Sequence, residues 1–135
     1  KLIYPMHMNP SVREMARKCF SKQKRIHMIE PLDVLDFHNI MARSYLIMTD
    51  SGGIQEEAPS LGKPVLVMRD TTERPEGVEA GTLRLVGTSE QPIYDAVMGL
   101  LNDESLYCEM LQSANPYGDG HASEYIASIL EKKLR

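Results

Sequence analysis

The chain is poor in aromatic residues and in cysteine, and it contains no long hydrophobic run. Its 135 residues include no tryptophan, two phenylalanines and two cysteines. Cys19 and Cys108 stand far apart and outside any CxxC or Cys/His spacing, which argues against a disulfide-stabilised or zinc-binding domain. We expect both to be core thiols in a reducing compartment. Without a membrane-length apolar run or a signal-peptide pattern, we expect a cytoplasmic protein.

No charge of one sign dominates either. The formal net charge is -4, and acidic and basic residues are spread along the whole length. Because no basic stripe is available to neutralise phosphates, nucleic acid is an unfavourable partner. The four histidines lack ligand spacing, so we expect no metal cofactor. With 42% hydrophobic residues, the chain can form the core of one domain.

Strand-like and helical apolar patterns alternate along the chain, as is typical of βα units that build a parallel sheet. We expect a Rossmann-like sheet of four parallel strands with helices on both faces, a polar loop over residues 70–81, and Ser11 as a helix cap. We expect further chain upstream, because the sequence begins inside a strand. The strand-like runs are residues 1–5, 25–29, 45–48, 64–68 and 83–86, and the helical patterns cover residues 12–20, 33–42, 54–61, 93–101, 105–112 and 122–130.

The candidate site is the glycine turn, which we define as Asp50, Ser51, Gly52 and Gly53. It joins a strand end to a helix start, where ligands bind in open α/β sheets. Glycines admit a close ligand, and the helix N-terminus favours an anion such as a diphosphate. Glu57 lies one helical turn beyond Gly53 and can accept hydrogen bonds from two ribose hydroxyls. The alternative is a plain tight turn with a solvated Glu57.

Three further positions fall near strand ends. Leu32 lies where a base can lodge, and Phe37 follows on the next helix, although core packing explains Phe37 equally. Arg74 lies beyond the strand at 64–68 and can reach a phosphate or sugar hydroxyl. A surface ion pair with Glu73 or Glu76 is the alternative for this arginine.

Residues 49–76, residues 7–14 and residues 115–120 together resemble the non-hydrolysing UDP-N-acetylglucosamine 2-epimerases of bacteria. The resemblance covers essentially the entire chain. It implies interconversion of UDP-N-acetylglucosamine and UDP-N-acetylmannosamine, by elimination and re-addition of UDP, without NAD or metal. It also implies two Rossmann-like domains arranged as in GT-B glycosyltransferases, a homodimer, and a role in cell-surface polysaccharide biosynthesis.

The resemblance assigns roles to the candidate residues. It implies that Ser51, Gly52 and Gly53 bind the diphosphate, that Glu57 binds the ribose, and that Arg74 binds the phosphate or sugar. These assignments agree with the chemistry read from the residues themselves.

Three assignments come from the resemblance for the first part of the chain. Phe37 would lie at the uracil, and Leu32 stands where family members carry glutamine, so only backbone contacts to uracil would remain there. His7, at the ligand edge of the sheet, resembles a residue that binds a second, regulatory UDP-N-acetylglucosamine in some members.

The catalytic acid and base of the family would precede Lys1, so the resemblance places no catalytic residue in this chain. Residues 1–135 are expected to form part of a C-terminal UDP-binding domain that, alone, binds UDP weakly and has no epimerase activity. Two alternatives stay open: a GT-B-type glycosyltransferase that uses a UDP sugar, and a non-catalytic sugar-nucleotide sensor.

Overall fold

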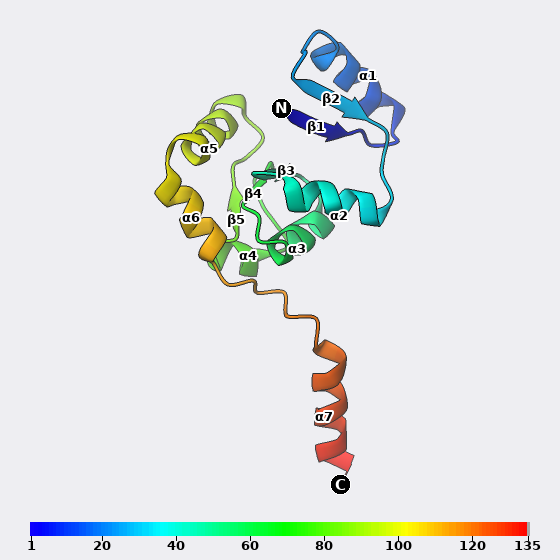
Figure 1. Ribbon diagram of the computed structural model, residues 1–135, viewed down its shortest axis with the longest axis vertical. Helices are drawn as coiled ribbons and strands as arrows, with labels where there is room; N and C mark the ends of the chain where they lie inside the picture. The colour runs from blue at the N-terminus through cyan, green and yellow to red at the C-terminus, as the bar shows by residue number, and fades with distance from the viewer. Residues whose placement is uncertain (135) are drawn as a thin grey trace. The chain divides into compact units, whose positions relative to one another are not determined.

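The computed structural model describes residues 1–134, and the chain divides into two compact units, Lys1–Ile40 and Met41–Arg135. The first unit holds β1 (Leu2–Pro5), α1 (Pro10–Phe20) and β2 (Ile26–Ile29) (Figure 1). The two strands pair in parallel, with Leu2 opposite Ile26. A parallel pair joined by a helix is the βα repeat that the alternating pattern predicted.

The first helix shows how local chemistry sets an element boundary. Asn9 is its N-cap, and the Asn9 side chain accepts a hydrogen bond from Ser11 N at 2.9 Å. Pro10 occupies the first helical position, where a missing N–H costs nothing. The expectation that Ser11 caps this helix is therefore wrong, because the cap is Asn9 and the helix starts two residues earlier, at Pro10.

The second unit carries the longer run of elements, and α2 (Val34–Arg43) crosses the boundary between the units. The three strands of the second unit form a parallel sheet in the order β3-β4-β5, with Val65 opposite both Ile47 and Leu83. The elements are β3 (Ile47–Thr49), α3 (Gly52–Ser60), β4 (Val65–Val67), α4 (Pro75–Glu79), β5 (Leu83–Leu85), α5 (Glu90–Asn102), α6 (Glu104–Gln112) and α7 (Ala122–Leu134).

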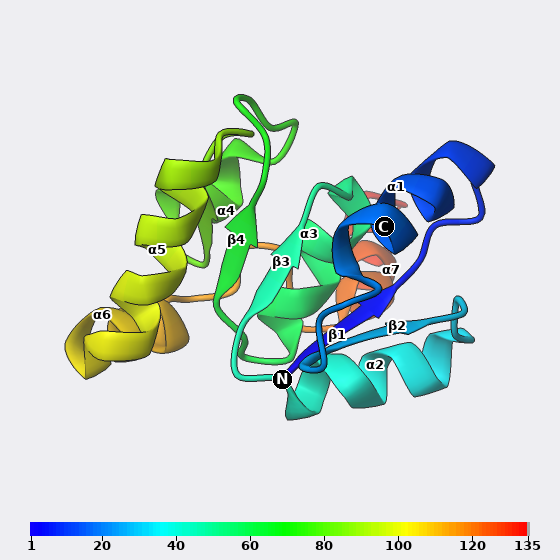
Figure 2. The same cartoon turned by 90° about the horizontal axis from the view of Figure 1, so that it is seen from above.

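The core of the second unit is built around β4, whose three residues are all completely buried. Leu66 packs with Leu100 of α5 and Met110 of α6. Because side chains alternate along a strand, Val65 and Val67 face the opposite side, where α3 contacts the sheet. Figure 2 shows α3 on one side of β3 and β4 and α5 on the other. The expected α/β class, with parallel strands flanked by helices, is confirmed.

Several expectations are corrected. The described residues contain five strands, one at each of the five strand-like runs, rather than the four expected in the sheet, and they pair as one group of two and one of three. Apolar patterns identify strands but do not say which strands pair. The loop expected at residues 70–81 contains α4, which starts at Pro75, a residue suited to a first helical position.

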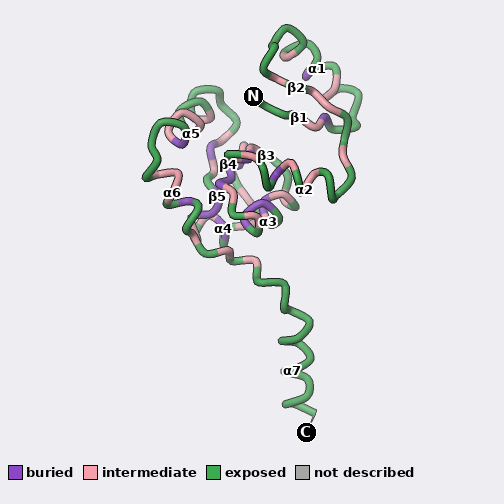
Figure 3. The backbone as a smooth tube through the Cα atoms, in the orientation of Figure 1, coloured by how far each residue is buried: buried purple, intermediate pink, exposed green. Residues whose placement is uncertain are grey.

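The cysteines and the last helix also differ from expectation in burial. Cys19 is exposed and Cys108 is half-buried, so neither is a core thiol; both are free. The α7 helix forms where its periodicity predicted, yet no residue of it is buried, and Ile126 is 57% exposed. Burial is concentrated instead around the three-stranded sheet (Figure 3). No helix within residues 1–134 has the length and apolar character needed to cross a membrane.

Two adjacent leucines of α5 test this core. Leu100 is completely buried and Leu101 is 54% exposed. We expect Leu100→Ala to lower the free energy of unfolding by about 3 kcal/mol, because it leaves a cavity against Leu66. Leu101→Ala, the matched control, should lower it by less than about 1 kcal/mol. Urea denaturation of both variants measures the difference, and equal losses would contradict this packing.

Candidate functional site

The candidate site is centred on the N-terminus of α3, which begins at Gly52 directly after β3. Ser51 is the N-cap residue, and its extended backbone turns the chain into the helix. Its side chain makes no capping hydrogen bond, while its backbone N donates to Thr49 Oγ1 at 3.0 Å. By helix geometry, the first-turn N–H groups, from Gly52 onward, lack carbonyl partners within the helix. This end of α3 therefore carries the polarity that attracts an anion.

Ser51 and Glu57 converge on Gly53. A Cβ atom placed on Gly53 would lie 3.8 Å from Glu57 Oε1 and 3.9 Å from Ser51 Oγ. Gly53 and Glu57 are one turn apart on the same face of α3. The structure thus brings three of the predicted residues together: a hydroxyl and a carboxylate near a glycine that has no side chain of its own. Such a group can offer amide donors to an anion and carboxylate oxygens to neighbouring hydroxyls.

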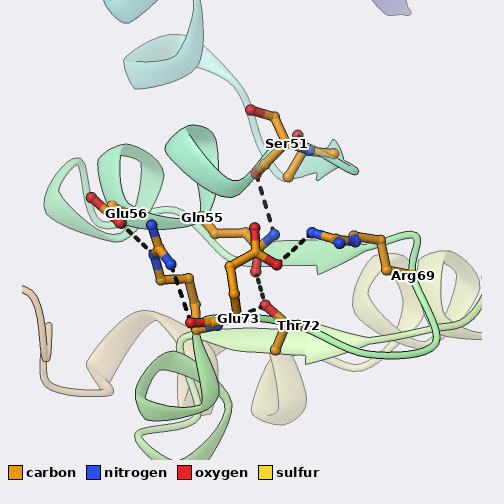
Figure 4. Close-up of polar contacts among 8 residues, drawn as sticks. Ser51, Gln55, Glu56, Arg69, Thr72 and Glu73 are labelled. Atoms are coloured by element: carbon orange, nitrogen blue, oxygen red, sulfur yellow. Dashed lines mark hydrogen bonds and ion pairs between the residues drawn. The ribbon is translucent and has the colours of Figure 1, made fainter.

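A loop covers the adjacent face of α3. A Cβ atom on Gly52 would lie only 2.5 Å from Glu73 Oε1. Further along the same face, the completely buried Gln55 donates from Nε2 to Ser51 O at 3.3 Å and accepts at Oε1 from Thr72 Oγ1 at 2.5 Å (Figure 4). The loop that follows β4 is therefore fastened to the helix that begins the site.

Arg74 is bound to α3 through this loop. Its Nε donates to Glu56 Oε1, its Nη1 donates to Glu73 O at 3.1 Å, and its backbone N donates to Thr72 Oγ1 at 3.0 Å. The hydrogen bond to Glu56 is the largest cause that raises the pKa of Arg74. The alternative considered for Arg74 was an ion pair with Glu73 or Glu76. The ion pair in the structure is instead with Glu56 on α3.

Glu73 is held by a cation of the same loop. Arg69 Nη1 lies 2.6 Å from Glu73 Oε2. The pKa of Glu73 is lowered, chiefly by a hydrogen bond from the Glu73 backbone. The charge of Arg69 and the hydrogen bond that Arg69 donates lower this pKa further. The carboxylate beside Gly52 is therefore ionised at neutral pH.

The remaining predicted residues belong to the first unit. His7 Nδ1 accepts from Asn9 N at 3.1 Å, and His7 O accepts from Arg13 Nε at 3.2 Å. Leu32 and Phe37 are half-buried, and Phe37 N donates to Asp33 O at 2.9 Å. These contacts fix their local conformation, and the ligand roles of His7, Leu32 and Phe37 stay predictions.

Sequence reasoning missed the polar residues that join α3 to the loop after β4, namely Gln55, Glu56, Thr72 and Glu73. A signal was present: Gly52, Gln55 and Glu56 follow the i, i+3, i+4 spacing of one helix face. That spacing does not indicate which loop will cover the face, so the pairing with residues 72–74 was not predictable from it.

Two glycines, Gly53 in the first turn of α3 and Gly62 just beyond its end, provide a test of this geometry. Gly53 has helical φ and room for a Cβ, whereas Gly62 has φ +63°. We expect Gly53→Ala to keep or raise the free energy of unfolding by up to about 1 kcal/mol. Gly62→Ala should lower it by about 1 kcal/mol, because L residues are strained at that φ. Thermal unfolding compares them, and a large loss for Gly53→Ala would show that this glycine is required by the fold itself.

Comparison with known proteins identifies the family. A family model described as UDP-N-acetylglucosamine 2-epimerase matches residues 1–131. A Bacillus subtilis protein named UDP-N-acetylglucosamine 2-epimerase is 62% identical over 130 residues, which cover 96% of this chain and 34% of that protein. The chain thus spans about a third of the length of the relative.

Solved structures agree in sequence and in fold. MnaA of S. aureus, in a structure with UDP, is 59% identical with a TM-score of 0.90, over 98% of this chain and 36% of that one. The UDP-GlcNAc 2-epimerase of Neisseria meningitidis, bound to UDP-GlcNAc, is 49% identical with a TM-score of 0.86, over 96% of this chain and 36% of that one. Because the family model fits nearly every residue, the chain belongs to the UDP-N-acetylglucosamine 2-epimerase family.

Proposed function

We propose that residues 1–135 form part of a C-terminal UDP-binding domain in a UDP-N-acetylglucosamine 2-epimerase. The observation that carries the proposal is the convergence of Ser51 Oγ and Glu57 Oε1 on Gly53, at the N-terminus of α3. A diphosphate needs donors and a positive potential, and this helix end offers both. The ribose needs acceptors about one helical turn away, where Glu57 lies.

The residues take distinct roles in this proposal. Ser51, Gly52 and Gly53 bind the diphosphate, and Glu57 accepts from the ribose hydroxyls. Arg74, in the loop after β4, donates to Glu56 of α3, which lies one turn from Gly52, and it adds a cation for the phosphate or sugar. Support for the ligand also comes from two relatives whose structures are described with UDP and with UDP-GlcNAc.

The whole protein would convert UDP-N-acetylglucosamine to its manno epimer by eliminating and re-adding UDP. The family resemblance supports this reaction, which uses no NAD or metal, and supports a cytoplasmic homodimer that serves cell-surface polysaccharide biosynthesis. The acid and base would lie in sequence ahead of Lys1. Uracil contacts by Phe37 and by the backbone of Leu32, and a regulatory role for His7, rest on the resemblance alone.

Removing the Glu57 carboxylate tests the ribose assignment. We expect Glu57→Ala to weaken UDP binding by about 2 kcal/mol, because two hydrogen bonds to a charged acceptor are lost. The loss should be smaller for 2′-deoxy-UDP, which has only one of the two hydroxyls. Isothermal titration calorimetry on the natural protein that contains this chain measures both.

Two further variants accompany Glu57→Ala, one as a control and one as a test of the backbone amides. Glu131→Ala, which removes an exposed carboxylate from α7, is the matched control and should bind UDP like wild type. Gly53→Val should block the backbone amides and abolish binding while the fold persists. Unchanged UDP affinity in both Glu57→Ala and Gly53→Val would refute the site.

The reaction itself distinguishes an epimerase from the other classes. Incubated with UDP-N-acetylglucosamine and no acceptor, the natural protein should produce the manno epimer, which proton NMR resolves at the anomeric position. A glycosyltransferase or a sensor would leave the substrate unchanged. The isolated 135 residues should give no turnover, and turnover by them would contradict the placement of the acid and base upstream.

A further inference from the structure

Gln55 is a polar side chain in an apolar position. It is completely buried in α3, between residues that are only partly buried or exposed in its first turn. Burying an amide is unfavourable unless each of its polar atoms finds a partner. An apolar side chain would fill the same space without that requirement. The hydrogen bonds of Gln55 are therefore the feature that distinguishes it from an ordinary core residue.

Those hydrogen bonds form a continuous chain, which we call the Gln55 relay. Gln55 Nε2 donates to Ser51 O at 3.3 Å, and Thr72 Oγ1 donates to Gln55 Oε1 at 2.5 Å. Thr72 Oγ1 in turn accepts from Arg74 N at 3.0 Å. The relay thus runs from the N-cap of α3 to the backbone of Arg74. It includes a contact between Gln55 and Thr72, which are 17 residues apart in sequence.

The polarity of the relay leaves no freedom for rearrangement. Ser51 O can only accept, so the Gln55 amide must direct its NH₂ group there and its oxygen toward Thr72. The Thr72 hydroxyl must then donate to Gln55, which leaves its lone pairs for Arg74 N–H. Each bond fixes the direction of the next, as happens in cooperative hydrogen-bond networks.

We propose that Gln55 and Thr72 are positioning residues, which hold Arg74 in register with the glycine turn. The inference rests on the proposed function, in which both of those elements contact the diphosphate or sugar. Glu56 holds the Arg74 side chain on α3, whereas the relay connects the Arg74 backbone to Ser51. Without it, the arginine and the helix N-terminus would no longer be presented to a ligand at a fixed spacing.

Thr72 is the residue to change, because it is only partly buried and lies in a loop. In the natural protein that contains this chain, we expect Thr72→Val to weaken UDP binding about tenfold, measured by calorimetry, while Thr72→Ser stays within about twofold of wild type. Thr72→Ala, which removes the hydroxyl without added bulk, provides the same test if Thr72→Val does not fold.

Two comparisons separate positioning from general stability. Thr82→Val removes another buried threonine hydroxyl, which donates to Gly77 O at 3.1 Å, and it should lower the melting temperature without weakening UDP binding. In an Arg74→Ala background, Thr72→Val should have less than about a twofold effect, because the residue it positions is gone.

Opposite results would overturn the proposal. Wild-type affinity in Thr72→Val and Thr72→Ala, or an undiminished loss in the Arg74→Ala background, contradicts the relay while the UDP site stands. A wild-type protein that does not bind UDP, or an Arg74→Ala variant that binds it unchanged, contradicts the proposed function of that residue or site as well.

Discussion

The proposed anion site depends on the amides at the start of α3, which by helix geometry lack carbonyl partners within the helix. Ser51 is the N-cap, yet its side chain makes no capping hydrogen bond. Serine normally stabilises a helix by such a bond, worth about 1 kcal/mol. The helix instead keeps its start through Gln55, whose backbone and side chain both donate to Ser51 O. These bonds hold the turn without using the Ser51 hydroxyl, which makes no capping hydrogen bond.

That arrangement depends on the packing of β4. The strand is buried on both faces, with Leu66 toward α5 and α6 and its two valines toward the other side. A strand so enclosed has little freedom to shift, and the loop that leaves it carries Arg69, Thr72, Glu73 and Arg74 to α3. The residues of the proposed site therefore come from two consecutive βα connections at the carboxyl edge of one sheet. Their relative positions are fixed by hydrogen bonds rather than by apolar contacts.

The sequence predicted correctly those features that depend on the geometry of a single strand or helix. The strand and helix patterns predicted the parallel α/β class, and the spacing of Gly53 and Glu57 predicted that both lie on one face of a helix, as they do in α3. Each of those inferences needs only the geometry of one strand end and one helix. The start of α1 was misjudged by two residues, because asparagine and serine cap equally well and Pro10 decided between them.

Predictions of burial failed where they depended on which neighbouring segment packs against a helix. Hydropathy ranks isoleucine inside and glutamine outside, but Ile54 is partly exposed and Gln55 is completely buried. The reversal arises because a polar loop, with a threonine hydroxyl to offer, packs on that face of α3. Cys19 was also expected in the core, because free cysteines are commonly buried, and it is exposed. Periodicity describes a helix by itself, whereas burial depends on its neighbours.

The two carboxylates beside the glycines illustrate how position on one helix separates chemical roles. Glu57 lies by Gly53, and Glu73 lies by Gly52, about 100° away around the α3 axis. Glu73 is paired with Arg69, so its charge is compensated and an approaching diphosphate meets less repulsion from it. Glu57 comes one turn later, where the positive end of the helix has weakened and an acceptor for hydroxyls is more useful than a partner for phosphate. A single short helix can thus present donors to the anion at its tip and an acceptor to the neutral sugar a turn further on, provided that the loop after β4 neutralises the other acid.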